Sequence, residues 1–199
     1  MSSRATPVPL GLVLSGGQST RMGYDKGLIL HQGLPWFIHA QQKLSSLGLE
    51  VVVNVNAAQR QPYAAWPGCA PLVVDKPLSQ GPLRGLLSVH VLFPERDLLV
   101  LPPDMLYVKC HLLADLLTLS TQQQGRIVAY ESPKGVEPFP AIYPARVLAE
   151  VALALARGEW PSFAMKYLLE KFEPSLLPWQ VQLTPEFRNL NRPEDLLDQ

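Results

Sequence analysis

Short, purely apolar runs recur along the first half of the chain, and they restrict its fold more than any other feature. They lie at Leu10–Leu14, Val51–Val53, Leu72–Val74 and Leu98–Leu101. None of them alternates apolar with polar positions, as a strand with one face in water does. Segments with apolar residues at helical spacing, at 36–47 and 83–92, separate these runs. The pattern predicts buried strands that alternate with helices.

Strands that alternate with helices predict a three-layer α/β/α architecture. The strands of such a chain form a mostly parallel sheet, because a right-handed crossover through each helix returns the chain in the same direction. Further elements are expected as helices at 108–119, 145–157 and 162–171, the last capped by Ser162, and as strands at 127–129 and 141–143.

The C-terminal part of the chain is less regular and predicts an antiparallel edge on the sheet. Prolines directly before Ala141–Tyr143 indicate an edge or a turn, since proline cannot donate to a strand ladder. A weak strand near 181–183 and a short helix at 193–197 complete the pattern. No linker or repeat interrupts the sequence, so we expect residues 1–199 to form one domain.

Composition excludes several classes of protein. Of 199 residues, 47% are hydrophobic and 17% are charged, which argues against disorder. Lys+Arg and Asp+Glu both number 17, so the basic excess typical of nucleic-acid binding is missing. No apolar run is long enough for a membrane span. The two separated cysteines, Cys69 and Cys110, and an N-terminus without an apolar signal-peptide core predict reduced thiols in the cytoplasm.

The first apolar run opens into a glycine-rich segment with two cations. Gly16 and Gly17 follow the run, and Arg21 and Lys26 come within the next nine residues. Backbone N–H groups exposed in such a turn bind anions. A flexible turn would explain the glycines but not the cations. The segment matches neither the Walker A pattern nor the dinucleotide-binding GxGxxG pattern. It therefore predicts a polyphosphate-binding loop of another type.

Polar residues also follow the other three apolar runs. Asn54, Asp75 and Asp104 stand at or just beyond the ends of these predicted strands. In parallel α/β sheets, ligands bind outside the carboxyl ends of the strands, near the point where the strand order reverses. Each of the three residues alone is explained equally well as a turn former or a helix cap. Together with the glycine-rich segment, they predict one shared binding crevice.

The order of these motifs resembles that of the molybdenum cofactor guanylyltransferases, the MobA family. The resemblance covers residues 10–197 and includes Gly16-Gly17-x-x-x-Arg21-Met22-Gly23, Asp25-Lys26-Gly27, Asn54, Asp75, Gly81-Pro82-Leu83-Arg84-Gly85-Leu86, Asp104, Pro138–Tyr143 and Asn189-Leu190-Asn191-Arg192-Pro193-Glu194-Asp195-Leu196. Three places depart from the family pattern. Ser15 stands where Ala is usual, and Pro102-Pro103 precedes Asp104 where the family has a Cys-Asp neighbourhood. One residue fewer than in some members separates Gly23 from Lys26.

The resemblance implies a nucleotidyltransferase with a Rossmann-like fold, which transfers GMP from GTP to the phosphate of molybdopterin or molybdenum cofactor and releases pyrophosphate. Transient contact with cofactor-delivery or molybdoenzyme-maturation proteins is also expected. The implied site residues are Leu14, Ser15, Gly16, Gly17, Lys26, Asn54, Asp75 and Asp104 for the nucleotide; Arg21, Lys26 and Asp104 for catalysis, with Asp104 as the Mg²⁺ ligand; and Pro82, Leu83, Gly85, Asn189 and Asn191 for the pterin substrate.

Several alternatives stay open at this point. A CTP-dependent molybdopterin cytidylyltransferase, another small-molecule nucleotidyltransferase, or a non-catalytic nucleotide- or pterin-binding protein would carry much the same motifs. A carboxylate such as Asp75 suits the paired N1–H and N2–H donors of guanine, but it suits a ribose as well. Asn189 and Asn191 are equally explained as caps of the last helix.

Overall fold

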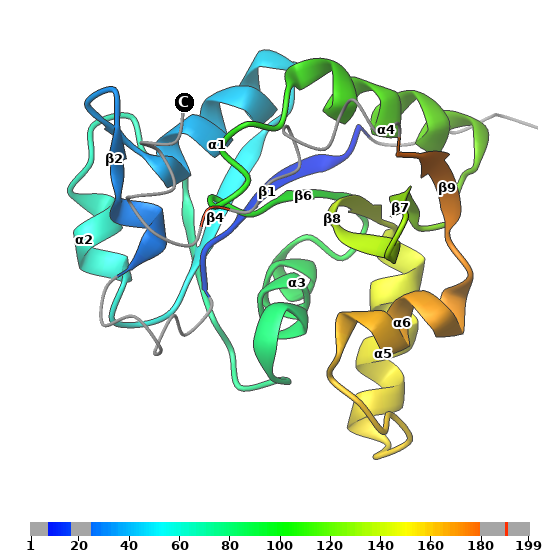
Figure 1. Cartoon of the computed structure of the whole chain (residues 1–199). Coiled ribbons are helices and arrows are strands. Elements are labelled where there is room, and N and C mark those ends of the chain that lie inside the picture. The colour runs from blue at the N-terminus through cyan, green and yellow to red at the C-terminus, as the bar shows by residue number, and fades with distance from the viewer. Residues whose placement is uncertain (1–7, 17–24, 180–189, 191–199) are drawn as a thin grey trace, which may run out of the picture.

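A seven-stranded sheet forms the centre of the computed structural model, which describes residues 8–16, 25–179 and 190. The strand order is β5-β4-β1-β6-β8-β7-β9 (Figure 1). The strands are β1 Leu10–Leu14, β4 Val51–Val55, β5 Leu72–Val74, β6 Leu98–Leu101, β7 Val128–Ser132, β8 Gly135–Tyr143 and β9 Ser175–Pro178. A small hairpin of β2 Leu30–His31 and β3 Leu34–Pro35 lies outside this sheet.

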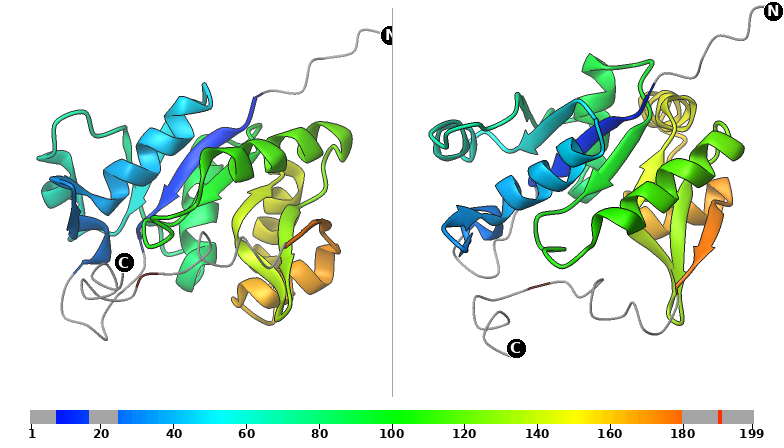
Figure 2. Two further views of the ribbon diagram at one scale, coloured as in Figure 1. Left: turned by 45° about the horizontal axis from the view of Figure 1, so that its top comes forward. Right: turned by 90° about the horizontal axis from the view of Figure 1, so that it is seen from above.

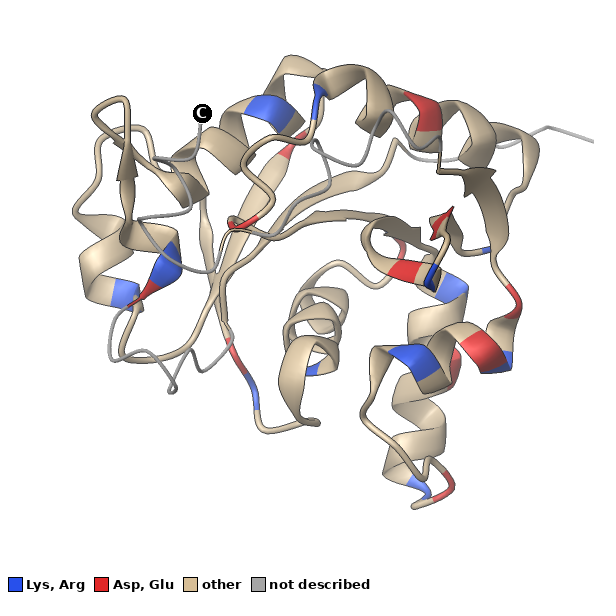
Figure 3. Cartoon of the chain, viewed as in Figure 1, with Lys and Arg blue, Asp and Glu red and all other residues tan. Residues whose placement is uncertain are grey.

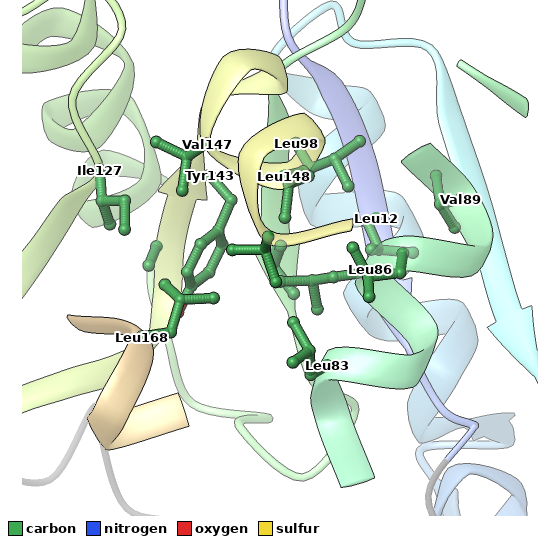
Figure 4. Close-up of a cluster of buried hydrophobic side chains, with 14 of the residues drawn as sticks. Leu12, Leu83, Leu86, Val89, Leu98, Ile127, Tyr143, Val147, Leu148 and Leu168 are labelled. Carbon is green, nitrogen blue, oxygen red and sulfur yellow. The ribbon is translucent and has the colours of Figure 1, made fainter. Parts of the chain in front are cut away.

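Helices cover both faces of the sheet, which confirms the three-layer prediction (Figures 1 and 2). The helices are α1 Trp36–Ser46, α2 Arg60–Ala64, α3 Gly81–Leu92, α4 Cys110–Gln122, α5 Ala145–Ala156 and α6 Met165–Phe172. Buried side chains of α1 and α4 form one core with one face of the sheet. Those of α3, α5 and α6 form a second core on the other face (Figure 4). Lys and Arg are interspersed with Asp and Glu over both helical layers (Figure 3).

The parallel half of the sheet follows the predicted alternation. β1 pairs in parallel with β4 on one side and with β6 on the other, so Val13 lies beside both Val53 and Leu101. The chain therefore leaves β1 in one direction across the sheet and later returns to its other side. This reversal of strand order next to β1 is the position where ligands bind in open α/β sheets.

The predicted sheet, mostly parallel with an antiparallel edge, is confirmed. The antiparallel strand is β8, which contains Ala141–Tyr143 and lies between β6 and β7 rather than last in the strand order. The prolines are accommodated because they fall where the pairing with β7 shifts register, between Ala129 and Tyr130. A bulge removes the need for a ladder donor at such positions. The described sheet ends instead in β9, which pairs in parallel with β7 and was not predicted.

Helix ends were predicted less well than helix positions. The helix expected at 162–171 begins at Met165, and its N-cap is Ala164, which makes no side-chain capping bond. Ser162 Oγ accepts a hydrogen bond from Ala164 N at 3.2 Å, as in a local Ser turn, so Ser162 does not cap the helix. The helix expected at 108–119 runs from Cys110 to Gln122. The strand predicted at 181–183 and the helix predicted at 193–197 lie outside the described residues.

Two further expectations, reduced cysteines and the lack of a membrane-spanning segment, concern the cellular compartment of the protein. Cys69 and Cys110 are both free cysteines in the structure. Among the described helices, none combines the length and hydropathy that a bilayer crossing requires.

A buried tyrosine anchors the bulged part of β8. Tyr143 is fully buried, and its hydroxyl donates to the carbonyl of Pro138 at 2.7 Å. Burial raises the pKa of Tyr143 above its usual range, so the hydroxyl stays a donor at neutral pH. Tyr130 makes the matching bond on β7, where its hydroxyl donates to Leu112 O at 2.9 Å.

Tyr143→Phe should lower the free energy of unfolding by about 1–2 kcal/mol, because it leaves the Pro138 carbonyl without this donor. Tyr130→Phe removes one tyrosine hydroxyl from the opposite helical layer and should cost a similar amount. Urea denaturation of both variants measures the two losses. An unchanged stability of Tyr143→Phe beside a loss in Tyr130→Phe would show that the bond does not hold the bulge.

Candidate active site

A cavity of about 400 Å³ opens at the carboxyl ends of β1, β4 and β6. Its lining comes from these strand ends, from the start of α3 and from the first half of β8. The lining residues are Leu14, Gly16, Asn54, Gly81, Pro82, Gly85, Pro102, Asp104, Met105, Glu137, Pro138 and Phe139. The polar strand ends predicted to converge therefore do so at β1, β4 and β6.

Asn54 presents a buried acceptor to this cavity. The residue is fully buried, and its Nδ2 donates to Val73 O at 3.2 Å and to Asp75 Oδ1 at 2.9 Å. Its Oδ1 accepts no hydrogen bond from the described residues. Buried polar atoms are rarely left without a partner, so this oxygen is suited to a donor on a bound ligand.

Two glycines keep the space beside that oxygen open. A Cβ atom added at Gly16 or at Gly85 would lie 2.4 Å from Asn54 Oδ1, well inside van der Waals contact. Any larger residue at either position would therefore fill the room in front of the acceptor. Gly16, just after β1, and Gly85, in the second turn of α3, thus shape the cavity through the side chains that they lack.

Asp75 adjoins the cavity behind Gly16. Its two carboxylate oxygens lie 2.7 and 2.9 Å from the position of a Cβ on Gly16. Burial raises the pKa of Asp75, while the hydrogen bond from Asn54 and the positive charge of Arg84 oppose the rise. The amide of Asn54 thus fixes the orientation of Asp75, and a half-buried carboxylate is ready to accept from ligand N–H or O–H groups.

Asp104 and Lys26 meet at the other side of the strand ends. Their charged atoms are 3.6 Å apart, and the two side chains are 26% and 21% exposed, respectively. Burial raises the pKa of Asp104, and the ammonium of Lys26 opposes that rise. Both residues also line a smaller cavity of about 140 Å³ together with Ser15 and Asp25, so the two cavities adjoin at Asp104.

A network around Asp25 holds the segment that carries Lys26. Asp25 is the N-cap of the short 3₁₀ helix Lys26–Leu28, and its Oδ1 accepts from Gly27 N at 2.9 Å. The same oxygen accepts from the hydroxyl of Tyr63 at 3.0 Å. Gly27 is required here, because a Cβ at this position would lie 2.0 Å from the Tyr63 hydroxyl.

Gln59 links this network to the end of β1. Its Nε2 donates to the carbonyl of Ser15 at 3.0 Å and to Asp25 Oδ2 at 2.8 Å. Its Oε1 accepts from the backbone N–H of Asn56 at 2.8 Å, which uses the remaining end of the amide. One buried side chain therefore connects the residues on either side of the glycine-rich segment. Sequence reasoning missed Gln59 and Tyr63, because α2 is only five residues long and shows no periodic pattern.

The chemistry of Asp104 suits a hard cation bound together with phosphates. Among the described residues, no group of three or more His, Cys, Asp or Glu side chains forms a complete metal cage. Mg²⁺ commonly takes only one or two carboxylates from a protein and completes its shell with water and substrate phosphates. One carboxylate beside a polyphosphate-sized cavity fits that requirement.

The remaining predicted residues fall into three groups. Pro82 and Gly85 line the larger cavity, whereas Leu83 is 1% exposed and packs in the core under α3 (Figure 4). Gly17, Arg21, Asn189 and Asn191 lie outside the described residues. Leu190, between the two asparagines in sequence, is buried with Trp36 and Leu106, and its N–H donates to Asp104 O at 2.8 Å.

Comparison with known proteins identifies the family. The family model described as the MobA-like NTP transferase domain matches residues 11–171. The chain belongs to this family of nucleotidyltransferases. A relative from Opitutus terrae, named probable molybdenum cofactor guanylyltransferase, is 31% identical over 206 residues, which cover 98% of this chain and 96% of the relative.

Solved structures agree on the fold. Molybdopterin-guanine dinucleotide biosynthesis protein A from Archaeoglobus fulgidus superposes with a TM-score of 0.72 at 19% identity, over 95% of each chain. The 2-C-methyl-D-erythritol 4-phosphate cytidylyltransferase from Thermus thermophilus gives 0.66 at 15% identity, also over 95% of each. These neighbours confirm the Rossmann-like nucleotidyltransferase fold of the chain.

Gln59→Leu should misplace Lys26 while it leaves the fold intact. The change removes the bridge between Ser15 and Asp25 and leaves three buried or half-buried partners without their bonds to Gln59, at a cost of about 1–3 kcal/mol of stability. We expect nucleotidyl transfer to slow by about tenfold or more, since small displacements of a charged group weaken its action on the reacting phosphate. Thermal unfolding and steady-state kinetics measure the two effects.

Gln61→Leu is the matched control, because Gln61 lies two residues further along α2 and is exposed. It should leave both the kinetics and the unfolding temperature close to those of the unchanged protein. Equal rates in Gln59→Leu and Gln61→Leu would rule out a role of Gln59 in positioning Lys26.

Proposed function

We propose that the protein transfers GMP from GTP to the phosphate of molybdopterin or molybdenum cofactor and releases pyrophosphate. The observation that carries this proposal is the arrangement of the cavity. Asn54 Oδ1 and Asp104 border the larger cavity at the strand-order reversal, and Lys26 pairs with Asp104 from the smaller cavity that adjoins it. The name of the Opitutus terrae relative supports the choice of GTP and molybdopterin.

The nucleotide occupies the β4 side of the cavity in this proposal. Asn54 Oδ1 and the carboxylate of Asp75 accept hydrogen bonds from the base or the ribose. Guanine offers adjacent N1–H and N2–H donors, a pair that cytosine and adenine lack, so two neighbouring oxygen acceptors favour GTP. Leu14 and the backbone of Ser15, Gly16 and Gly17 hold the sugar and the triphosphate.

Charge neutralisation is the main task of the protein in this reaction. The phosphate of the pterin is an anion at neutral pH, so its attack on the α-phosphorus requires no general base. Arg21 and Lys26 offset the negative charge that accumulates on the α-phosphate and on the departing pyrophosphate. Asp104 holds Mg²⁺, which when bound screens the charge of the triphosphate oxygens.

The pterin substrate contacts Pro82 and Gly85 at the start of α3, together with Asn189 and Asn191. Leu83 contributes indirectly, because its burial in the core sets the position of this helix turn. Cofactor-delivery and molybdoenzyme-maturation proteins would meet the enzyme at the mouth of the cavity. We place the reaction in the cytoplasm, on the ground that the two cysteines are free thiols.

A second candidate is transfer of CMP from CTP, since the Thermus thermophilus neighbour with the same fold is a cytidylyltransferase. Pyrophosphate release from GTP and from CTP, each with molybdopterin as acceptor, decides between the two. We expect turnover with GTP only. Turnover with CTP alone would exclude the guanylyl reaction, and binding of GTP–Mg²⁺ without any turnover would indicate a non-catalytic protein.

Asp104→Asn should lower activity without lowering the stability of the fold. Because burial raises the pKa of Asp104 above its ordinary value of 3.8, the folded state binds the proton more tightly than the unfolded state. Ionisation of Asp104 therefore costs stability as pH rises above 3.8, and a neutral amide avoids that cost. We expect Asp104→Asn to lose about 100-fold or more in Mg²⁺-dependent turnover, with an unfolding temperature at pH 7 equal to or above that of the unchanged protein.

The stability difference between Asp104→Asn and the unchanged protein should shrink as pH is lowered toward 3.8, because the Asp104 carboxyl takes up a proton there while the asparagine amide is neutral at every pH. Asp115→Asn on the exposed face of α4 serves as the control for loss of one negative charge. Thermal melts from about pH 4 to pH 8 and pyrophosphate assays over a Mg²⁺ series give both readouts. An unchanged rate in Asp104→Asn would remove this residue from the metal site.

A further inference from the structure

One wall of the larger cavity has no part in nucleotide binding as proposed above. This wall, the β8 wall, consists of Glu137, Pro138 and Phe139. It reaches the cavity because β8 runs antiparallel to β6. Val100 pairs with Ala141, so the residues before Ala141 continue past the carboxyl end of β6 and arrive beside Asp104. The start of β8, and not its end, therefore borders the site.

Glu137 has a fixed position and free acceptor capacity. The buried hydroxyl of Ser132 donates to Glu137 Oε1 at 2.6 Å, and the pairing of Glu137 with Tyr130 places it on the hairpin of β7 and β8. No other hydrogen bond or ion pair to this side chain occurs among residues 8–16, 25–179 and 190. An ionised carboxylate accepts about four hydrogen bonds, so room for two further donors is left.

The sheet order places Glu137 across the cavity from the nucleotide. Asn54 is on β4 and Glu137 on β8, with β1 and β6 between them. At a strand spacing of about 4.8 Å, these two strands lie roughly 14 Å apart, which leaves space for a ring system on each side of one phosphate. Because the attacking and leaving oxygens stand roughly in line on opposite sides of the phosphorus, an acceptor approaches from the side away from the pyrophosphate.

We propose that Glu137 is a specificity-determining residue that binds the 2-amino-4-oxo edge of the pterin substrate. The N3–H and 2-amino groups of that edge form a pair of adjacent donors, which a carboxylate accepts together. Pro138 and Phe139 make the rest of the β8 wall apolar, as a flat ring requires. The inference rests on the proposed function, since it assumes a pterin as the second substrate.

Glu137→Gln tests the assignment, because it keeps the shape of the side chain but replaces one acceptor oxygen by a donor. We expect the KM for molybdopterin to rise about tenfold or more, the effect of losing one charge-assisted hydrogen bond, while the KM for GTP stays within about twofold. Glu131→Gln is the matched control on the same hairpin, since Glu131 is exposed and does not line the cavity. It should leave both constants unchanged.

A second measurement uses binding alone and does not depend on turnover. Pterin and lumazine differ at position 2, where lumazine carries an oxo group that a carboxylate repels. In fluorescence titrations with GTP–Mg²⁺ present, the unchanged protein should bind pterin about tenfold or more tightly than lumazine, and Glu137→Gln should bring the two within about threefold.

The two experiments separate failure of this inference from failure of the proposed function. A protein that prefers pterin through Glu137 but releases no pyrophosphate keeps the inference and loses the guanylyltransferase proposal. A protein that turns over GTP with an equal KM for molybdopterin in Glu137→Gln keeps the function and overturns the inference. Equal weakening of GTP and pterin in Glu137→Gln, or no preference for pterin over lumazine in the unchanged protein, also overturns it.

Discussion

The pairing of β1 between β4 and β6 fixes the position of every described group in the site. Parallel neighbours on both sides bring three carboxyl ends to the same edge of the sheet, where Gly16, Asn54 and Asp104 meet. The start of α3 lines the same space from one face of the sheet. Because both cores are built from buried side chains of these same strands, a shift of β1 would disturb the packing and the site together.

Two half-buried carboxylates, Asp75 and Asp104, give the site its electrostatic character. Burial raises the pKa of both Asp75 and Asp104, so each is less stable as an anion than it would be in water. Each has one side-chain partner: the amide of Asn54 donates to Asp75, and the ammonium of Lys26 pairs with Asp104. A ligand that brings N–H donors to the first and a cation to the second would relieve both costs.

The sequence allowed prediction of those parts of the site that follow from strand direction alone. Gly16, Asn54 and Asp104 are found at strand ends because runs of apolar residues reveal the strands, and parallel strands end at a common edge. Gln59 and Glu137 escaped prediction for a different reason. Gln59 belongs to a helix too short for a periodic signal, and Glu137 depends on a bulge whose register only the folded hairpin shows. The expectation that the whole chain forms one domain stays a prediction.

The two substrate sides of the cavity are built on strands of opposite direction. Asn54 and Gly16, which the proposed function assigns to the nucleotide, lie on or directly after parallel strands, whereas the β8 wall comes from the start of an antiparallel strand. Substitutions in the first half of β8 can therefore alter this wall without changing the parallel strand ends on the other side of the cavity. The Thermus thermophilus cytidylyltransferase shares the fold at only 15% identity. Under the proposed function, the choice of acceptor would depend on one hairpin, while the parallel strands that align the phosphates keep their geometry.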